Sequence, residues 1–208
     1  MNDDMMFNKP LSPDFFYDRR GRARVLYTRH RGMRADIDAW MNASDSYTHS
    51  LILSAKFIDD VYGKKIYYPR PSHGIDPYFK SSWIECMGHP LIKPHVDWQI
   101  RNKFRTHNDI KRWTVNLFDL AHNRATFRRS RAAKGTRHWL SDWIYNHIHW
   151  RAIRRSPVCV ADAMTARRAI RYAPIFCIND DDANTPEIMG GNAKFLADRF
   201  PNKCEFEK

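Results

Sequence analysis

The spacing of apolar residues predicts several helices along this 208-residue chain. Between positions 46 and 62, apolar side chains such as Leu51 and Ile58 recur on one face of a helix. Asp45 or Ser46 can cap the start of this helix, and Gly63 can end it. The same periodicity predicts further helices that begin at Asp76-Pro77 and at Asn108-Asp109. We also expect a helix from Ser141 to Ile153 that is dense in Trp and His, and a helix that Thr185-Pro186 begins and that ends near Phe200.

Short apolar runs predict strands at Ala23–Thr28, Lys65–Tyr68 and Pro174–Ile178, and Pro10 and Pro13 predict a loop near the amino terminus. The run at 174–178 is continuously apolar and is followed by a polar loop and a capped helix, which is typical of an α/β unit. In open α/β sheets, ligands bind beyond the carboxyl ends of the strands. Asn179 and Asp180 therefore stand where a ligand is expected, although an Asx turn would use the same residues.

Composition narrows the class of protein. Hydrophobic residues make up 43% and charged residues 28%, which predicts a folded chain and excludes global disorder. No apolar run approaches the roughly 20 residues that span a bilayer, and the acidic amino terminus lacks a signal-peptide pattern. The four cysteines lack a framework spacing and predict reduced thiols in a cytoplasmic protein. We expect one α/β domain, helix-rich with a few short strands.

The net charge of +12 is concentrated in one stretch. Between Arg101 and Arg171 there are 17 Lys and Arg residues against four Asp residues. A basic, Trp-rich stretch can bind nucleic acid, and it can equally attract a sugar diphosphate, an anionic polymer or an acidic membrane surface. A solvated basic face without a ligand has the same composition, so charge alone leaves these alternatives open.

Candidate chemistry lies at scattered positions. The adjacent carboxylates Asp3 and Asp4 can hold Mg²⁺, which prefers oxygen ligands, or can be a frayed acidic terminus. His73 precedes the predicted helix at Asp76 and can serve in acid–base chemistry. Arg105 can clamp a phosphate or form a surface ion pair. The chain has no Walker loop, no dinucleotide fingerprint and no nucleophile elbow.

Several of these positions fall within motifs that resemble the Stealth family. Positions 2–9 (NDDMMFNK) and 13–16 (PDFF) resemble the end of its second conserved region. Positions 48–63, the pair Ser72-His73 and positions 103–106 (KFRT) resemble its third region. Positions 176–180 (FCIND) and 200–207 (FPNKCEFE) resemble its fourth. We therefore divide the chain into 1–30, 45–121 and 172–208 as parts of these regions, with a basic, Trp-rich helical segment at 122–171.

The family includes bacterial capsule phosphotransferases and the N-acetylglucosamine-1-phosphotransferase that tags lysosomal enzymes. The resemblance implies transfer of a hexose 1-phosphate from a UDP-sugar to a hydroxyl of a polysaccharide or glycan acceptor. It implies catalytic roles for Asp3, Asp4, His73 and Arg105, with Mg²⁺ on the two aspartates, and substrate-binding roles for Lys9, Asn179 and Asp180. It further implies a cytoplasmic enzyme, at the inner face of the membrane through peripheral association, with no nucleic acid as partner.

One departure from the family matters for activity. Its first conserved region and most of its second, which carry much of the nucleotide site, have no counterpart in this sequence. We expect a fragment, a start codon assigned too late, or a second chain that supplies the rest. A nucleic-acid-binding protein and an inactive remnant of the transferase remain the alternative functions.

Overall fold

The computed structural model describes residues 5–27, 46–63, 71–72, 74–104, 106, 108–131, 139–179 and 184–202. Helices make up 51% and strands 15% of this part, which is the mixed content of an α/β protein. The chain divides into two compact units. Unit 1 consists of the described residues of Met1–Leu11, His73–Ile75 and Ser130–Lys208, and unit 2 of those of Ser12–Ser72 and Asp76–Arg129. Whether one catalytic domain comprises both units stays a prediction.

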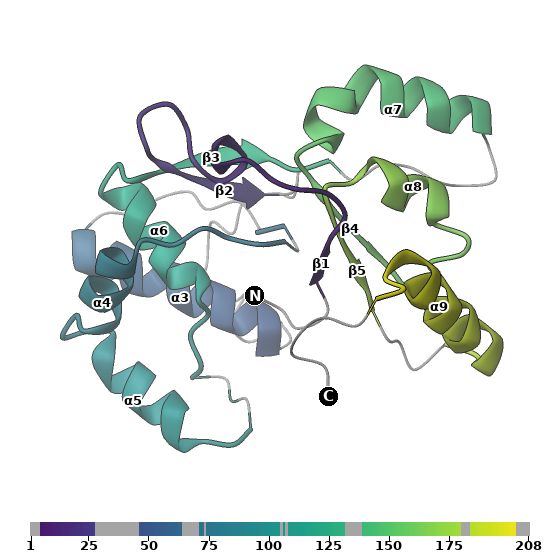
Figure 1. Ribbon diagram of the computed structural model, residues 1–208. Coiled ribbons are helices and arrows are strands. Elements are labelled where there is room, and N and C mark those ends of the chain that lie inside the picture. Colours follow the sequence, from purple (N-terminus) through teal and green to yellow (C-terminus); the bar gives the residue numbers. More distant parts are fainter. Residues whose placement is uncertain are drawn as a thin grey trace. The chain divides into compact units, whose positions relative to one another are not determined.

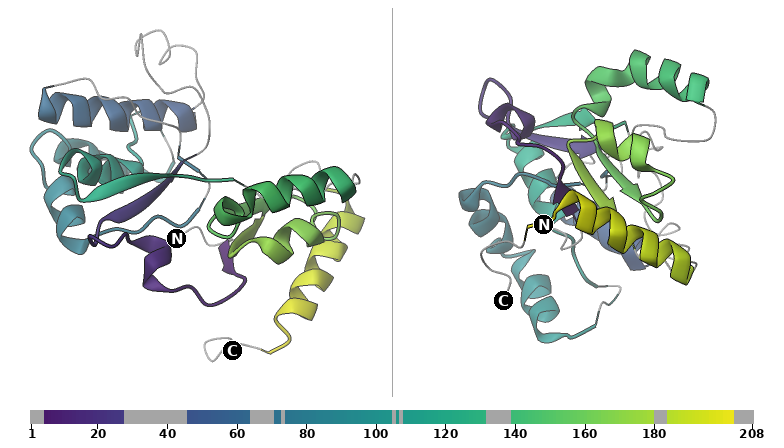
Figure 2. Two further views of the ribbon diagram at one scale, coloured as in Figure 1. Left: turned by 90° about the horizontal axis from the view of Figure 1, so that it is seen from above. Right: turned by 45° about the vertical axis from the view of Figure 1, so that its right-hand side comes forward.

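Unit 1 is a small sheet with helices against it. Its elements are β1 (Met5–Phe7), α7 (Trp139–Ile153), β4 (Pro157–Val160), α8 (Arg167–Tyr172), β5 (Ile175–Ile178) and α9 (Pro186–Arg199). The strand order is β1-β5-β4, with β5 antiparallel to β1 and parallel to β4. Figures 1 and 2 show α7, α8 and α9 gathered beside these strands.

The core of unit 1 forms on one face of this sheet. Phe176 lies in register between Met6 of β1 and Val158 of β4, and it packs with Ile170 of α8 and Phe195 of α9. The alternate residues of β5, Ile175 and Cys177, are also buried. A strand buried on both faces is apolar throughout, which explains the continuous run that identified β5 in the sequence.

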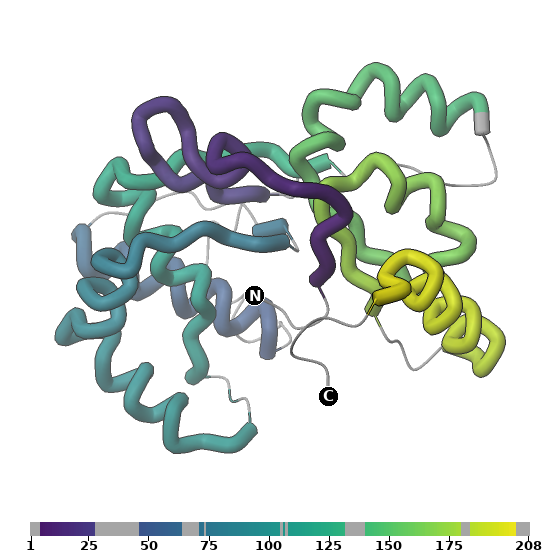
Figure 3. The backbone as a smooth tube through the Cα atoms, viewed as in Figure 1, coloured from purple at the N-terminus to yellow at the C-terminus, as the bar shows by residue number. Residues whose placement is uncertain are grey.

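Unit 2 packs helices against a two-stranded parallel sheet. Its elements are α1 (Pro13–Phe16), β2 (Ala23–Tyr27), α3 (Ser46–Tyr62), α4 (Lys80–Met87), α5 (Lys93–Arg101), α6 (Trp113–Ala121) and β3 (Ala125–Arg129). The trace in Figure 3 shows β3 following α6 and returning beside β2. The core includes Val25 of β2, Leu51 and Ile58 of α3, and Phe118 of α6, all nearly inaccessible to solvent.

Most of the predicted elements are confirmed within the described residues. The helices at 46–62, 141–153 and 185–200 correspond to α3, α7 and α9, and the strands at 23–28 and 174–178 correspond to β2 and β5. Thr185 caps α9, because its hydroxyl accepts a hydrogen bond from the Ile188 amide. The strand predicted at 65–68 lies outside the described residues. Pro13 begins the short helix α1 where a loop was predicted, since proline suits the first turn of a helix.

The helix predicted from Asp76-Pro77 is present as α4, but its predicted start is wrong, because α4 begins at Lys80. Tertiary contacts hold these two residues in non-helical chain. The Asp76 carboxylate is buried and lies 3.8 Å from the Arg112 guanidinium, and the Pro77 carbonyl accepts a hydrogen bond from the Asn116 side chain. The Asp76 side chain therefore meets a distant arginine instead of capping a helix.

The helix predicted from Asn108-Asp109 is present as α6, but its predicted start is also wrong, because α6 begins at Trp113. Asp109 is buried and turns back toward Thr106, accepting hydrogen bonds from its hydroxyl at 2.9 Å and its amide at 3.2 Å. Aspartate side chains compete in this way with helical backbone hydrogen bonds. The apolar residues Ile110 and Trp113 are both buried, although only Trp113 belongs to the helix.

Asn192 fastens α9 to the turn that follows β4. Its side chain is buried, donates to the Ala161 carbonyl and accepts from the Ala163 amide, both at 2.8 Å. Asn192→Ala should leave both backbone groups without a partner and lower the free energy of unfolding by about 2 to 4 kcal/mol. Urea denaturation followed by circular dichroism measures this loss. Lys194→Ala, an exposed position on the same helix, should change stability by less than about 0.5 kcal/mol, and equal losses would contradict this role for Asn192.

Candidate functional site

The sheet of unit 1 brings three strand ends to one edge. Because β1 is antiparallel to β5 and pairs Met5 with Cys177, the amino end of β1 lies beside the carboxyl end of β5. The parallel strand β4 ends at the same edge, where Val160 pairs with Ile178. We call this the carboxyl edge, formed by Met5, Val160, Ile178 and Asn179. It is the position at which α/β sheets bind ligands.

Asn179 extends this edge by one residue. Its amide donates to the Val160 carbonyl at 2.7 Å, which continues the pairing of β4 with β5. Its side-chain oxygen accepts a hydrogen bond of 3.6 Å from the Cys177 thiol, and the residue is exposed to solvent. The Asn184 side chain donates to the Asn179 carbonyl at 3.4 Å, just before the cap of α9. The backbone of Asn179 is therefore fixed, while its amide group faces a solvent-accessible edge.

Lys9 lies at the opposite edge of the sheet from Asn179. The preceding residue, Asn8, donates its amide to the Pro174 carbonyl, where β5 begins. The four residues of β5 separate the two edges by roughly 13 Å. Partial desolvation and the nearby Arg154 lower the pKa of Lys9 from its ordinary value. The structure therefore does not bring the two described members of the predicted substrate-binding set together.

Asn8 holds this opposite edge in place. Its side-chain amide donates to the carbonyls of Ile170 and Ala173, both at 2.8 Å. Its own carbonyl accepts from the Arg199 guanidinium at 3.0 Å, and its side-chain oxygen contacts the same group. One asparagine from the start of the chain therefore joins β1 to the ends of α8 and α9.

A cationic cavity of about 330 Å³ opens beside Asn8. Its lining consists of Asn8, Met164, Arg167, Ile170, Arg171, Phe195, Asp198 and Arg199. Arg167 and Arg171 lie one turn apart on α8, and neither forms an ion pair within the described part of the chain. Three guanidinium groups beside one carboxylate favour an anionic group such as phosphate.

The remaining predicted site residues fall outside the described residues, namely Asp3, Asp4, His73, Arg105 and Asp180. Their predicted convergence therefore stays a prediction. Among the residues that the structure describes, no three His, Cys, Asp or Glu side chains are arranged to hold a metal ion. The magnesium site predicted at Asp3 and Asp4 likewise stays a prediction.

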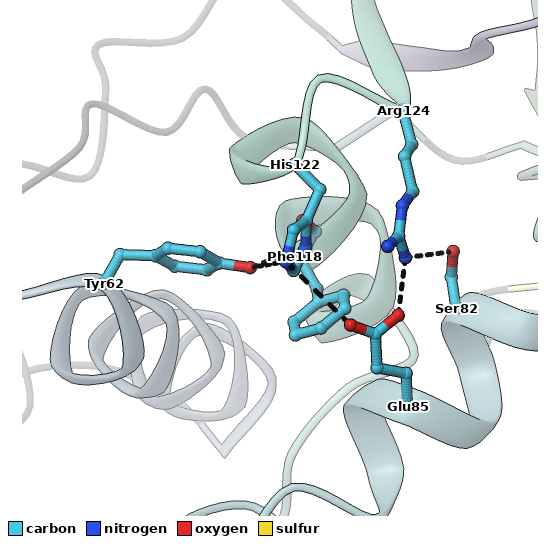
Figure 4. Close-up of polar contacts among 6 residues, drawn as sticks. All are labelled: Tyr62, Ser82, Glu85, Phe118, His122 and Arg124. Atoms are coloured by element: carbon cyan, nitrogen blue, oxygen red, sulfur yellow. Dashed lines mark hydrogen bonds and ion pairs between the residues drawn. The ribbon is translucent and has the colours of Figure 1, made fainter.

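Unit 2 contains a polar cluster that the sequence did not reveal (Figure 4). The Tyr62 hydroxyl of α3 lies 2.6 Å from Nδ1 of His122, which follows α6. Arg124 binds Glu85 of α4 at 2.7 Å, and Glu85 lies 4.0 Å from Nε2 of His122. Burial raises the pKa of Tyr62 to about 12, so its phenol stays protonated at neutral pH. The cluster joins α3 and α4 to the turn between α6 and β3, and its protonated phenol is a hydrogen-bonding group rather than a nucleophile.

Two buried carboxylates in unit 2 are held in an unfavourable environment. Burial raises the pKa of Asp119, and neither of its side-chain oxygens accepts a hydrogen bond of ordinary length from the described residues. Burial likewise raises the pKa of Asp76 to about 6, although Arg112 opposes this shift. Asp76 lies three residues after His73 in the chain. Perturbed carboxylates of this kind are candidates for functional residues, and sequence spacing alone gave no sign of either.

The chain was also compared with known proteins. No protein-family model matches it, and the search of curated proteins finds no similar sequence.

In the part of the chain that the structure describes, no helix has both the length and the apolar character needed to cross a bilayer.

The Asp76 environment predicts a pH-dependent stability. Below about pH 4 the Asp76 carboxyl is protonated in both the folded and the unfolded protein. Between about pH 4 and 6 it ionises in the unfolded chain but stays protonated in the folded protein. As pH rises from 4 to 7, the free energy of unfolding of the wild type should therefore fall by up to about 3 kcal/mol relative to that of the Asp76→Asn variant. Urea denaturation of both proteins across this range measures the difference. A constant difference would show that Asp76 has an ordinary pKa.

Proposed function

We propose that this chain is part of a Stealth-type transferase, which moves a hexose 1-phosphate from a UDP-sugar to a hydroxyl group of an acceptor. One observation supports the proposal most directly. The pairing of Met5 with Cys177 places the start of β1 at the same sheet edge as Asn179. In the sequence, Asp4 immediately precedes Met5 and Asp180 immediately follows Asn179, and both aspartates lie outside the described residues.

The proposed reaction exchanges one phosphorus–oxygen bond for another. The acceptor hydroxyl oxygen attacks the phosphorus that bears the sugar, and the bond from that phosphorus to the bridging oxygen of the diphosphate breaks. UMP leaves with the bond electrons, and the sugar 1-phosphate is then esterified to the acceptor. His73 takes the hydroxyl proton, because imidazole titrates near neutral pH. Arg105 stabilises negative charge on the transferred phosphoryl group.

The other proposed residues bind and orient the donor and the acceptor. Asp3 and Asp4 are the residues that would hold Mg²⁺, whose charge would neutralise the diphosphate. Asn179 presents an exposed amide on a fixed backbone and orients the sugar together with Asp180. Lys9 lies at the opposite edge of the sheet, where a longer acceptor rather than the reacting phosphate would meet it.

Release of UMP from a panel of UDP-sugars tests this function. The assay should use the chain together with any in-frame sequence that precedes Met1 in its gene. His73→Ala should lower kcat by about 10² to 10⁴-fold, because the proton acceptor is lost. His89→Ala, a histidine in the turn after α4, is the matched control and should keep full activity. Equal activity of His73→Ala and the wild type would remove His73 from the mechanism.

Arg105→Ala should lower kcat by about 10² to 10³-fold while leaving the fold intact, since it removes charge stabilisation at the phosphoryl group. Arg101→Ala changes an exposed arginine at the end of α5 and should have little effect. If both variants lose activity equally, the loss reflects general charge rather than a specific clamp.

Chelation of divalent cations should abolish UMP release, and Asp3→Asn with Asp4→Asn should raise the Mg²⁺ concentration needed for half-maximal rate. A nucleic-acid-binding protein would instead release no UMP and would bind DNA with an affinity that falls steeply with salt and does not require Mg²⁺.

A further inference from the structure

Helix α7 presents apolar side chains to solvent and polar side chains to the protein. Five large apolar residues on this helix are between 44% and 67% exposed, namely Leu140, Trp143, Ile144, Ile148 and Trp150. Asp142 and Asn146, on the other side of the helix, are 2% and 8% exposed. A surface helix of a globular protein normally has the opposite arrangement, so this exposed side fits an apolar partner.

The exposed residues form two adjacent rows along the helix, which together we call the α7 face. One row contains Trp143, His147 and Trp150, and the other contains Leu140, Ile144 and Ile148, at helical intervals of three or four residues. The Trp143 and His147 rings stack with centroids 5.3 Å apart. Side chains that project from one side of one helix can contact a single flat surface together.

Positive charge borders the α7 face. Arg151, Arg154 and Arg155 are exposed at its carboxyl end, and the Arg154 guanidinium lies 4.5 Å from the centre of the Trp150 ring. The one carboxylate of α7, Asp142, is buried on the opposite side. The α7 face therefore combines aliphatic groups, tryptophans and cations, with no acidic side chain of α7 exposed on it.

A cavity of about 230 Å³ between α7 and α8 adjoins this face. The residues that line it include the aromatic Trp143, Trp150 and Tyr172 and the basic Arg154 and Arg168. Aromatic walls with two cations suit a group that is apolar at one end and anionic at the other. A phospholipid headgroup with the upper part of its acyl chains has this character.

We propose that the α7 face docks on an anionic phospholipid bilayer, with the helix in the plane of the interface and a lipid phosphate against Arg154 and Arg168. At 15 residues the helix lies on the membrane surface rather than across it. A nucleic acid would contact the arginines but would leave Ile144 and Ile148 in water. A second copy of the chain would bring the same cations together. The proposal does not depend on the reaction proposed above.

Exposed apolar residues of unit 2 provide matched controls. Ile84 is 63% exposed and Trp98 is 51% exposed, close to the values of Ile148 and Trp150. On α5, Trp98 and Ile100 are two residues apart and so point to opposite sides of the helix. Trp98 and Ile100 therefore do not form a single apolar face on α5 comparable to the α7 face.

Co-sedimentation of the whole chain with vesicles tests the proposal. Vesicles of phosphatidylcholine containing phosphatidylglycerol should bind the wild type, and vesicles of phosphatidylcholine alone should bind it at least about tenfold more weakly. Ile148→Ser and Trp150→Ala should each reduce vesicle binding about tenfold, because each removes apolar surface that the bilayer would bury. Arg154→Gln should reduce binding only to the anionic vesicles. Hydrogen exchange should slow in α7 when anionic vesicles are added.

Ile84→Ser and Trp98→Ala should bind vesicles as the wild type does, and circular dichroism should show that all the variants are folded. Equal losses in the unit 2 and α7 variants would overturn the assignment to α7. The proposal would also be overturned by equal binding to neutral and anionic vesicles. Absence of vesicle binding would overturn it as well. If light scattering then showed a dimer that the Ile148→Ser variant does not form, the α7 face would bind a second copy of the chain instead of a bilayer.

Discussion

The antiparallel pairing of β1 with β5 is the constraint on which unit 1 depends. It joins segments from the two ends of the chain, and the Asn8 side chain reinforces it by bonding to Ile170, 162 residues away in sequence. Without β1, the buried central strand β5 would be an edge strand with unpaired backbone groups. The same pairing decides which ends of the strands share an edge, so it places the start of β1 beside Asn179 at the end of β5.

The two edges of this sheet have different chemistry. At the carboxyl edge the pairing of β4 with β5 ends at Asn179, whose side chain is exposed to solvent. At the opposite edge, Asn8 and three arginines surround a cationic cavity. Unit 1 therefore holds Asn179 and the cationic cavity at opposite edges of its sheet, and the α7 face adds a surface of mixed apolar and cationic character.

Unit 2 shows how burial changes the properties of polar residues. The sequence predicted Asp76 as a helix cap and gave Asp119 no particular role, yet both side chains are buried and have raised pKa values. Their partners come from elsewhere in the chain, as Arg112 does for Asp76. Neither perturbation follows from local sequence, because desolvation depends on how distant elements pack. In contrast, the apolar face of α3 follows directly from periodicity, and Leu51 and Ile58 are buried as predicted.

Local sequence by itself determined α3, α7, β2, β5 and α9, because their periodicity, apolar runs and caps act within a few residues. It also placed Asn179 at the end of a buried strand. Only the tertiary structure decided that α4 begins at Lys80, since Asp76 meets Arg112, and that Lys9 and Asn179 lie at opposite edges of one sheet. These outcomes depend on contacts between residues far apart in sequence, which short-range propensities do not encode.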